Sequence, residues 1–465
     1  MPTDATFRQM PFRQFALIVS LLFGGCAVYH PAPLDHGAVA RALRPPSLGK
    51  LQVAAGEIRH PLLAPVRFTS RAGLTPDQAA VLAVLINPSL RATRDRSGVA
   101  AAQLFQAGIL PNPQVTGSVD FVSGGTITPG LVTAYGVGAS WDFQALVQLG
   151  AKRAAARANL QAVDLDIAWA EWQIAQGAKL AFYRVLSDQE QLSRARQVDA
   201  RLQENLDVVR RASSAHEQTA IDLAAAQAAS QDAHAVALAL EQDLAHQRLA
   251  LKRAIGFPPD AQLRLREGIS LPSHVSTPSS AELMANLEDR RLDLLALKKG
   301  YESEEAKLRS AILAQFPKIS LGLNQASDTS NVHTIGPALT IDLPIFDRGQ
   351  GTIAFERATR QQLRDEYFNR IFEARSDVAT ALSDIRALEK QIAALEEAIP
   401  VLQKMVDDFR VAAGQGNLSA FDFYVAQNNL NQKSIQIIKL KQQLIETRTA
   451  LELATGRYLP GRTNE

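Results

Sequence analysis

Two carboxylates stand at matched positions, each three residues after a hydroxyl side chain. Thr219 precedes Asp222 by this spacing, and the pair recurs 200 residues later as Ser419 and Asp422. A hydroxyl three residues before an acidic side chain is the pattern of a capping box, in which both side chains bind backbone N–H groups at a helix start. The carboxylate also gains from the positive end of the helix dipole. The spacing therefore predicts helices that begin just after residues 219 and 419.

The single cysteine, Cys26, follows two glycines at the end of an apolar run over residues 15–23. A basic start, a short apolar stretch and small residues form a secretory signal, and about nine apolar residues are too few to span a bilayer. The cysteine resembles that of a bacterial lipobox, in which the thiol is acylated, although Phe23 stands where Leu is usual. We predict a lipoprotein signal peptide over 1–25 and lipidation of Cys26. The alternative is an ordinary signal peptide with an unmodified cysteine.

The rest of the chain predicts no catalytic, metal or cofactor site. Its 8 histidines are scattered singly, and no nucleophile with a neighbouring base or glycine-rich phosphate loop is visible. The 49 basic and 47 acidic residues leave a net charge of +2 without a basic stripe, so nucleic acid is not an expected partner. Ala, Gln, Leu, Arg and Glu dominate and aromatic residues are only 6%, which favours long helices over a thick core.

The middle of the sequence repeats after 200 residues. Many residue types return at this offset, in three pairs of segments: 202–212 and 402–412, 220–227 and 420–427, 242–256 and 442–456. This period is far longer than the 20–50 residues of a solenoid repeat. We therefore predict one structural unit used twice, over 76–260 and 261–465, after an extended segment over 26–75.

Each half contains two stretches in which apolar and polar residues alternate. These predict β-hairpins over 114–143 and 318–343, with Val115, Val119 and Phe121 on one face of the first. Strands of a soluble sandwich alternate in the same way, but strands of about ten residues with one apolar face suit a transmembrane barrel better. A barrel needs about eight strands or more, so several chains must contribute. A trimer would supply twelve strands.

Each hairpin leads into a very long predicted helix that turns and comes back. Residues from Val378 to Phe409 follow a 3-4-3-4 apolar spacing, which is the seam of a coiled coil. Pro400 lies within this seam and is expected to kink or interrupt the helix. Short helices are predicted between residues 76 and 108, and a linker follows residue 257. The remaining predicted helices are 150–212, 219–255, 280–314, 351–413 and 418–455.

This plan of hairpin, long helix, tight turn and returning helix, made twice, resembles the TolC-like outer membrane efflux proteins, in particular the lipoproteins of the heavy-metal and multidrug branch. Three short segments resemble family junctions and turns: AGILPNP at 107–113, LPIFDRG at 343–349 and GQGNLSAFD at 414–422. The resemblance implies a mainly α fold with a transmembrane β-barrel. Three chains would form a 12-stranded barrel in the outer membrane and an α-helical tunnel in the periplasm.

The resemblance also implies roles for the two turns. In the family, the turn at the periplasmic end closes the tunnel and contacts a periplasmic adaptor protein. Rings of carboxylates just after this turn attract cations. Asp422 and Asp222 would then be gate residues, although Val425 stands where a second ring carboxylate is usual. The adaptor-contact residues would be Gly414, Gly416, Leu418, Ser419 and Thr219. The first turn lacks glycines, so we expect two kinds of docking site to alternate around the tunnel.

The function implied is that of an outer membrane channel in a tripartite efflux system. It would conduct substrate passively from an inner-membrane pump, of the resistance-nodulation-division type, through a periplasmic adaptor to the exterior. The alternative is a periplasmic coiled-coil adaptor or structural lipoprotein without channel activity. Adaptors carry a compact β domain between their helical arms, so four amphipathic strands beside long helices favour the channel. The cargo stays open among metal ions, drugs and other solutes.

Overall fold

The computed structural model describes residues 27–43, 47–68, 73–124, 130–415 and 417–459. The predicted signal peptide and Cys26 lie outside these residues. The chain divides into two compact units, Met1–Pro45 and Pro46–Glu465. The first contains helix α2 (His36–Leu43), and the second contains every other helix and strand of the described residues.

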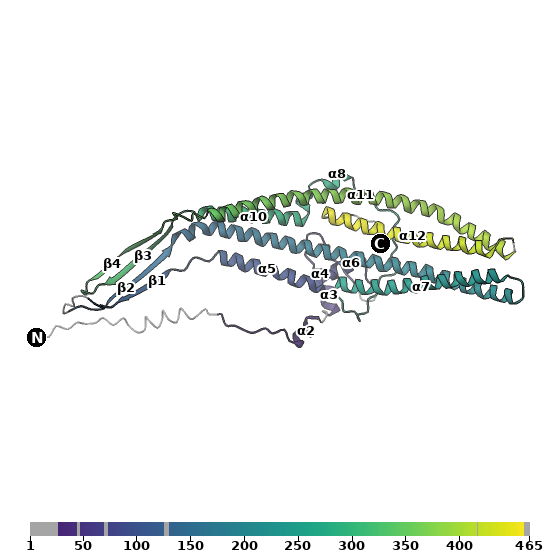
Figure 1. The fold of residues 1–465 in the computed structure, drawn as a ribbon, viewed down its shortest axis with the longest axis horizontal. Coiled ribbons are helices and arrows are strands. Elements are labelled where there is room, and N and C mark those ends of the chain that lie inside the picture. Colours follow the sequence, from purple (N-terminus) through teal and green to yellow (C-terminus); the bar gives the residue numbers. More distant parts are fainter. Residues whose placement is uncertain (1–26, 44–46, 69–72, 125–129, 416, 460–465) are drawn as a thin grey trace. The chain divides into compact units, whose positions relative to one another are not determined.

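The second unit presents the same series of elements twice (Figure 1). After α3 (Leu48–Gly56), the first series is α4 (Pro76–Ile86), α5 (Pro88–Ala107), β1 (Gln114–Asp120), β2 (Ala134–Asp142), α6 (Phe143–Ser214) and α7 (Ala220–Ile255). The second series is α8 (Ser280–Met284), α9 (Leu287–Arg290), α10 (Leu292–Leu313), β3 (Lys318–Ser327), β4 (His333–Asp342), α11 (Gln350–Gly414) and α12 (Ala420–Thr455). The mainly α fold with two hairpins and two long helix pairs is thus confirmed.

The segment over 26–75 is not wholly extended, because it contains α2 and α3. Helix α3 is only 9 residues long, too short to show a clear apolar period in the sequence. Its Leu51 and Ala55 are buried and join the main hydrophobic core. A helix of this length is unstable alone and depends on such packing.

Three expectations for the helices were wrong in detail. Helix α6 begins at Phe143, not at residue 150, because Asp142 accepts hydrogen bonds from the N–H groups of residues 144 and 145 and caps the helix where the strand ends. The helix expected over 280–314 is three helices, broken where Asn286 takes a left-handed conformation with φ 53° and where Arg291 is extended. Of the two effects expected of Pro400, a kink or an interruption, the interruption is wrong, since α11 runs for 65 residues through it.

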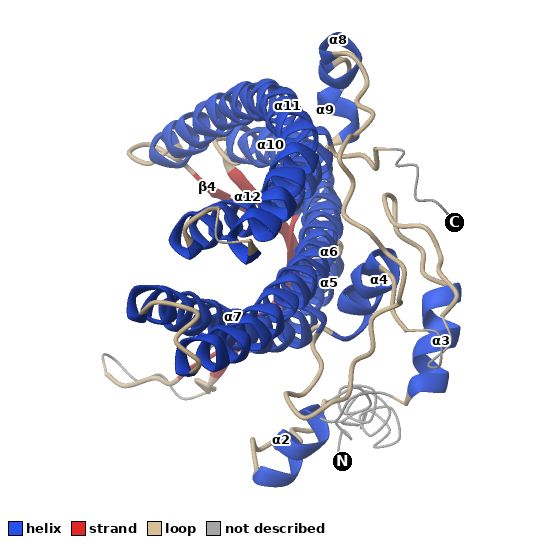
Figure 2. Cartoon of the chain, turned by 90° about the vertical axis from the view of Figure 1, so that its right-hand side faces the viewer, coloured by secondary structure: helices blue, strands red, loops and turns tan. Residues whose placement is uncertain are grey.

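The long helices lie side by side in a curved layer, with α3 and α4 on the side of α6 away from α12 (Figure 2). Helix α6 has 72 residues, which is about 108 Å at 1.5 Å per residue. The sheet lies at one end of these helices and the turns after α6 and α11 at the other (Figure 1). None of the described helices is both long and apolar enough to cross a membrane.

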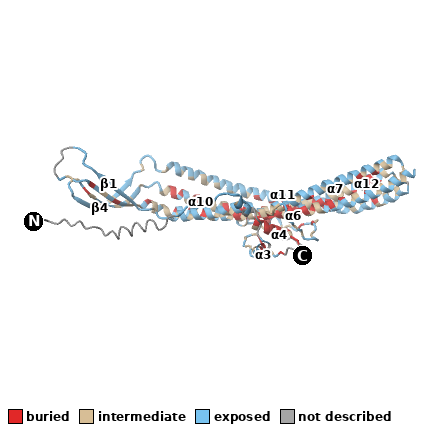
Figure 3. Ribbon diagram, turned by 90° about the horizontal axis from the view of Figure 1, so that it is seen from below, coloured by how far each residue is buried: buried red, intermediate tan, exposed pale blue. Residues whose placement is uncertain are grey.

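The buried side chains gather midway along the helices, where α4 packs against α6, and few lie on the strands (Figure 3). The coiled-coil seam of α11 is confirmed, since Val378, Ile385 and Ile392 are buried in the main core. Leu388 and Leu395 pack against them. Helix α12 also contributes to this core, so the two halves of the sequence share one core and are not separate domains.

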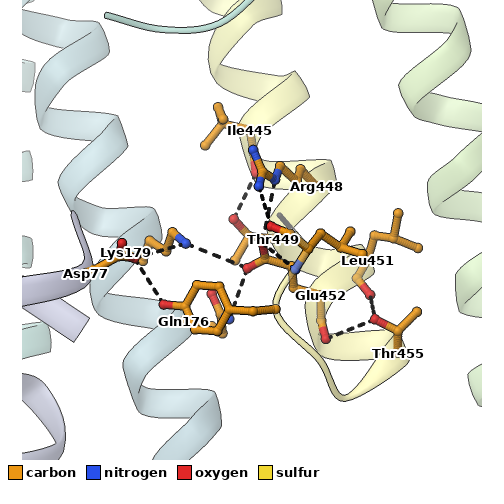
Figure 4. Close-up of polar contacts among 11 residues, drawn as sticks. Asp77, Gln176, Lys179, Ile445, Arg448, Thr449, Leu451, Glu452 and Thr455 are labelled. Carbon is orange, nitrogen blue, oxygen red and sulfur yellow. Dashed lines mark hydrogen bonds and ion pairs between the residues drawn. The ribbon is translucent and has the colours of Figure 1, made fainter. Parts of the chain in front are cut away.

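The polar end of α12 is held in the same region (Figure 4). The buried carboxylate of Glu452 accepts from the Leu459 N–H at 3.3 Å and lies 3.5 Å from Arg448 Nε and 3.7 Å from Lys179 Nζ. Arg448 Nη2 donates to the Leu459 carbonyl at 2.6 Å. Burial raises the pKa of Glu452, and the charges of Lys179 and Arg448 oppose the rise. The segment after α12 is therefore fixed to both α12 and α6.

Helices α7 and α12, which run back along α6 and α11, end in equivalent contacts, which we call joints. Asn87, just before α5, donates from Nδ2 to the carbonyl of Ala254 at 2.8 Å. Arg291, just before α10, donates from Nη1 to the carbonyl of Ala454 at 3.1 Å. A left-handed glycine follows in each case, Gly256 with φ 101° and the matching glycine after α12 with φ 61°. The 200-residue repeat therefore extends to the contacts that end α7 and α12.

Gly256→Ala is expected to destabilise the helical region by about 1–2 kcal/mol, because the left-handed conformation disfavours a side chain. A Cβ at this position would also lie 2.8 Å from the Asn87 Cα. Gly177→Ala is the matched control, since no atom lies within 4 Å of a Cβ there and the residue is inside α6. It should stabilise the protein by up to about 1 kcal/mol. Thermal unfolding followed by circular dichroism measures the stability of both variants. Equal effects of the two changes would contradict the role assigned to Gly256 in this joint.

Candidate channel wall and end turns

The four strands form one antiparallel sheet in the order β1-β2-β3-β4, and its register sorts the side chains onto two faces. Residues directly opposite each other point to the same face. Val137 pairs with Gln325, Ala139 with Leu323 and so on across the sheet. One face is mainly apolar, formed by Val115, Val119, Tyr135, Val137, Ala139, Trp141, Ile319, Leu321, Leu323, Ile335, Pro337, Leu339 and Ile341. Gly117, Gln325, Ser327 and His333 lie on the same face, the last three near the end remote from the helices. The other consists of small, polar and charged residues, among them Thr116, Ser118, Ser140, Ser320, Asn324 and Thr340.

Within the described residues, most side chains of the apolar face are exposed. Val115 is 76% exposed, Ile335 70% and Leu339 60%, on three positions spread over both outer strands. A contiguous apolar surface of this kind marks a contact with a membrane or another protein. It is therefore the surface through which the sheet meets an apolar environment.

Aromatic side chains mark both ends of this apolar face. Tyr135 lies at the end remote from the helices, next to His333 with ring centroids 6.2 Å apart. Trp141 lies at the helical end, where its Nε1 donates to the Pro111 carbonyl at 2.7 Å and its ring contacts Phe143. The six residue steps from Tyr135 to Trp141 span about 20 Å of strand. Aromatic girdles of this kind flank the apolar band of transmembrane barrels.

The sheet is open at both edges among the described strands. Strand β1 pairs only with β2, and β4 pairs only with β3. Pro337 lies in β4, and proline is tolerated in a sheet at such an edge. Each edge presents a row of backbone N–H and C=O groups that can pair with a further strand. Two free edges allow the sheet to continue into neighbouring chains on both sides.

The turn residues occupy the helix starts that the spacing predicted. Thr219 caps α7, and the reciprocal box with Asp222 is complete, with the Thr219 Oγ1 donating to the carboxylate at 2.5 Å. Ser419 caps α12 through the Phe421 N–H at 3.1 Å. Asp422 lies in the first turn of α12 and is exposed, whereas Asp222 is half-buried. The two carboxylates therefore differ in environment.

The two turns also share their backbone geometry. The Glu217 N–H donates to the Ala212 carbonyl at 2.8 Å, and the Asn417 N–H donates to the Ala412 carbonyl at 2.9 Å. His216 has φ 62° at the position that the 200-residue offset aligns with Gly416, which lies outside the described residues. The first turn thus reverses the chain in the same way without glycine. Its difference from the second turn lies in its side chains.

Near these turns, a small apolar cluster joins the helix pair α6 and α7 to the helix pair α11 and α12. Phe423 and Tyr424 on α12 are buried against Leu202 on α6 and Ala226 on α7. Burial raises the pKa of Tyr424, and the negative charge of Asp222 adds to the rise. Asp222 of the first half therefore acts on a side chain of the second half. No local sequence pattern predicts this contact, because the residues lie about 200 positions apart.

The remaining residues of the predicted site are spread along the second turn. Gly414 is the last residue of α11 and is exposed, and Leu418 is half-buried in the turn itself. Ser419 is exposed at the start of α12. Among the described residues, no group of three or more His, Cys, Asp or Glu side chains is arranged to hold a metal ion.

Comparison with known proteins connects this geometry to a family. Residues 283–457 match the outer membrane efflux protein family. Residues 283–457 therefore contain an outer membrane efflux protein domain. The fold of the chain is that of solved channel structures.

Solved structures with the same fold include three outer membrane channels. The structure of CusC, which describes transmembrane channel formation, has a TM-score of 0.68 at 19% identity and covers 86% of this chain and 99% of that one. The outer-membrane channel OprN has a TM-score of 0.71 at 15% identity, covering 93% and 99%. The open state of the Neisseria gonorrhoeae channel MtrE has a TM-score of 0.66 at 19% identity, covering 86% and 96%.

His216→Gly is expected to stabilise the first turn by about 1 kcal/mol, because glycine adopts the left-handed conformation without a steric cost. Glu217→Gly, one residue further along the same turn, is the control and should not stabilise, since Glu217 does not have a positive φ. Hydrogen exchange of the peptide covering residues 208–222 reports the local effect. Faster exchange in the His216→Gly protein would contradict the strain assigned to this residue.

Proposed function

We propose that three copies of this chain form a channel through the outer membrane and across the periplasm. The observation that carries the proposal is the sheet, with one continuous apolar face and two unpaired edges. In lipid, every backbone polar group of a strand must be paired, so an open sheet can span only when neighbouring chains close it. Four strands from each of three chains give a 12-stranded barrel, within the range known for such barrels.

The orientation of the barrel follows from its two faces. The apolar face, with Tyr135 and Trp141 at its ends, would meet lipid and the aqueous boundaries. The face bearing Thr116, Ser320 and Asn324 would line a water-filled pore, as polar interior residues do in porin-like barrels. The long helices continue from the sheet and would form the tunnel wall. No step needs a reacting group in this chain, so the conduction is passive.

We assign the turns after α6 and α11 to the far end of the tunnel, where a periplasmic adaptor would dock. The exposed side chains Ile221, Phe421 and Val425 give this end apolar contact points, and the exposed Asp422 gives it negative charge. Three copies would place Asp422 in a ring around the aperture. An inner-membrane pump, of the resistance-nodulation-division type, would then deliver substrate through the adaptor.

A lipid anchor at Cys26 is part of the proposal. An acyl chain on this cysteine would add to the membrane attachment that the barrel provides. Lipid labelling of the wild-type protein and its absence in Cys26→Ser would support the anchor. Labelling that persists in Cys26→Ser would exclude it.

The channel proposal is tested by ion conductance of the purified protein in a planar lipid bilayer. Wild-type protein should insert and conduct. Asp422→Ala should raise the open population about fivefold, the factor for about 1 kcal/mol, because the ring would no longer bind the cation that holds its three like charges together. Asp408→Ala is the matched control, because it removes an exposed carboxylate of α11 outside the first turn of α12. It should leave the conductance unchanged.

Two results separate the parts of this proposal. Protein that never conducts and does not partition into the outer membrane fraction would favour the structural lipoprotein without channel activity. Conductance that is the same in wild type and Asp422→Ala would keep the channel but remove Asp422 from its gate. Asp222→Ala in the same assay tests the second gate residue, and a rise like that of Asp422→Ala is expected if both carboxylates hold the aperture.

A further inference from the structure

A buried carboxylate stands in the contact between α10 and α11, close to the sheet. The Glu304 side chain on α10 is only 2% exposed, and its Oε2 lies 3.2 Å from Lys307 Nζ. Its Oε1 is buried without a hydrogen-bond donor within the described part of the chain. A buried carboxylate oxygen left without a donor is costly, so some group must reach it.

The group that reaches Glu304 is a second carboxyl, that of Glu356 on α11. The hydrogen bond to Glu304 raises the pKa of Glu356 to about 7, with burial and the Glu304 charge adding to the rise and Lys307 opposing it. Two ionised carboxylates cannot both accept in one hydrogen bond. A carboxyl pair in contact therefore holds a proton between its oxygens.

Among the described residues, no other charged group around the pair can replace this proton by binding the free oxygen of Glu304. Glu356 of α11, Lys307 of α10 and Lys152 of α6 line one cavity of about 710 Å³, to whose wall α5 contributes the neutral Gln103. Lys307 already binds the other oxygen of Glu304. One turn along the same contact, Arg360 of α11 binds Glu305 of α10 at 3.3 Å. No cation among these groups reaches the Oε1 of Glu304 by a hydrogen bond.

The position of the pair gives it influence over α11. Helix α12 has 36 residues and runs back along α11 from the turn, so it covers about 54 Å of the roughly 98 Å of α11. The first third of α11, beside the sheet, lies beyond the end of α12. There α10 is the helix that packs against it, through Glu304 and Glu305 among others. The carboxyl pair is thus one of two polar links that hold this part of α11.

We propose that Glu304 and Glu356 share one proton across the contact between α10 and α11, and that loss of this proton loosens the first turns of α11, residues 350–360. This region follows directly after β4 and joins the sheet to the long helix. The contact is a pH-sensitive link in the wall of the molecule. It depends on the pair alone and holds whether or not the protein conducts.

The direction of the pH dependence follows from proton linkage. A carboxyl that is released from the contact ionises at its ordinary pKa, near 4.5, whereas the shared proton is held up to about pH 7. The contact is therefore fully stabilised below about pH 4.5 and weakens as the pH rises toward 7. Because one proton is involved, the equilibrium constant for opening rises by at most about tenfold per pH unit. Above pH 7 the weakening levels off.

Hydrogen exchange of the full-length assembled protein, corrected for the intrinsic pH dependence of exchange, tests the link. In wild type, opening of residues 350–360 should rise between pH 5 and 7 and then level off. Glu356→Gln should stay protected at every pH, because its amide donates to Glu304 without titrating. Glu304→Gln should also stay protected at every pH, because the new amide donates to the Glu356 carboxylate. Glu305→Gln is the control, since it breaks the neighbouring ion pair and should keep the wild-type pH profile.

Three results would overturn the proposal. The first is a wild-type profile without pH dependence, and the second is an unchanged profile in Glu356→Gln and Glu304→Gln. The third is protection that Mg²⁺ or Ca²⁺ restores at pH 8 in wild type but not in Glu356→Gln. In that case the two carboxylates hold a divalent cation in place of the proton.

Discussion

The pairing of strand edges is the constraint on which the rest of this structure depends. Water satisfies the free N–H and C=O groups of an edge strand in solution, but lipid does not, and each unpaired group there costs several kcal/mol. The sheet has apolar side chains on one face and two free edges, β1 and β4. These features conflict in a single chain and agree in a ring of several chains. In the proposed channel, assembly would therefore be a condition for the fold of the sheet as well as for conduction.

The long helices, which lead away from the sheet, also depend on packing against neighbours. Each hairpin passes into a helix of 65 or 72 residues, and a shorter helix returns only part of the way. The cores gather where the returning helices end, at the joints of Asn87 and Arg291 and around the buried Glu452. A second, smaller cluster around Leu202 and Phe423 lies near the turns. Toward the sheet, no residue of α11 before Ala374 is buried. The stability of this part of α11 must come from its neighbours, and the carboxyl pair of Glu304 and Glu356 is one such local contact.

The sequence predicted the parts of the fold that a local pattern controls. Strand alternation, the heptad seam through Ile385 and the hydroxyl caps at Thr219 and Ser419 each depend on residues a few positions apart, and the structure contains all of them. The errors have local causes too. Asp142 starts α6 early by capping it, and Asn286 breaks the expected helix by taking a left-handed conformation that few sequence signals reveal.

Contacts between distant residues were beyond the sequence. The joint of Arg291 with Ala454, the effect of Asp222 on Tyr424 and the carboxyl pair join positions tens to hundreds of residues apart. The 200-residue repeat showed that one unit is used twice, but not which residues of the two units meet. Of the predicted gate and adaptor residues, Thr219, Asp222, Ser419 and Asp422 lie at the helix starts. Their roles remain predictions that depend on the assembly of several chains.

Closure of the sheet by neighbouring chains is tested most directly by disulfide cross-linking between β1 and β4. Thr116→Cys on β1 and Thr340→Cys on β4 place thiols on the polar face at opposite edges. Within one chain these edges lie three strand spacings apart, about 14 Å, too far for a disulfide. With a scan of neighbouring β4 positions to find the register, the account predicts a ladder of cross-linked species that ends at three chains. Absence of cross-links at every register, or a ladder that continues beyond three chains, would contradict it.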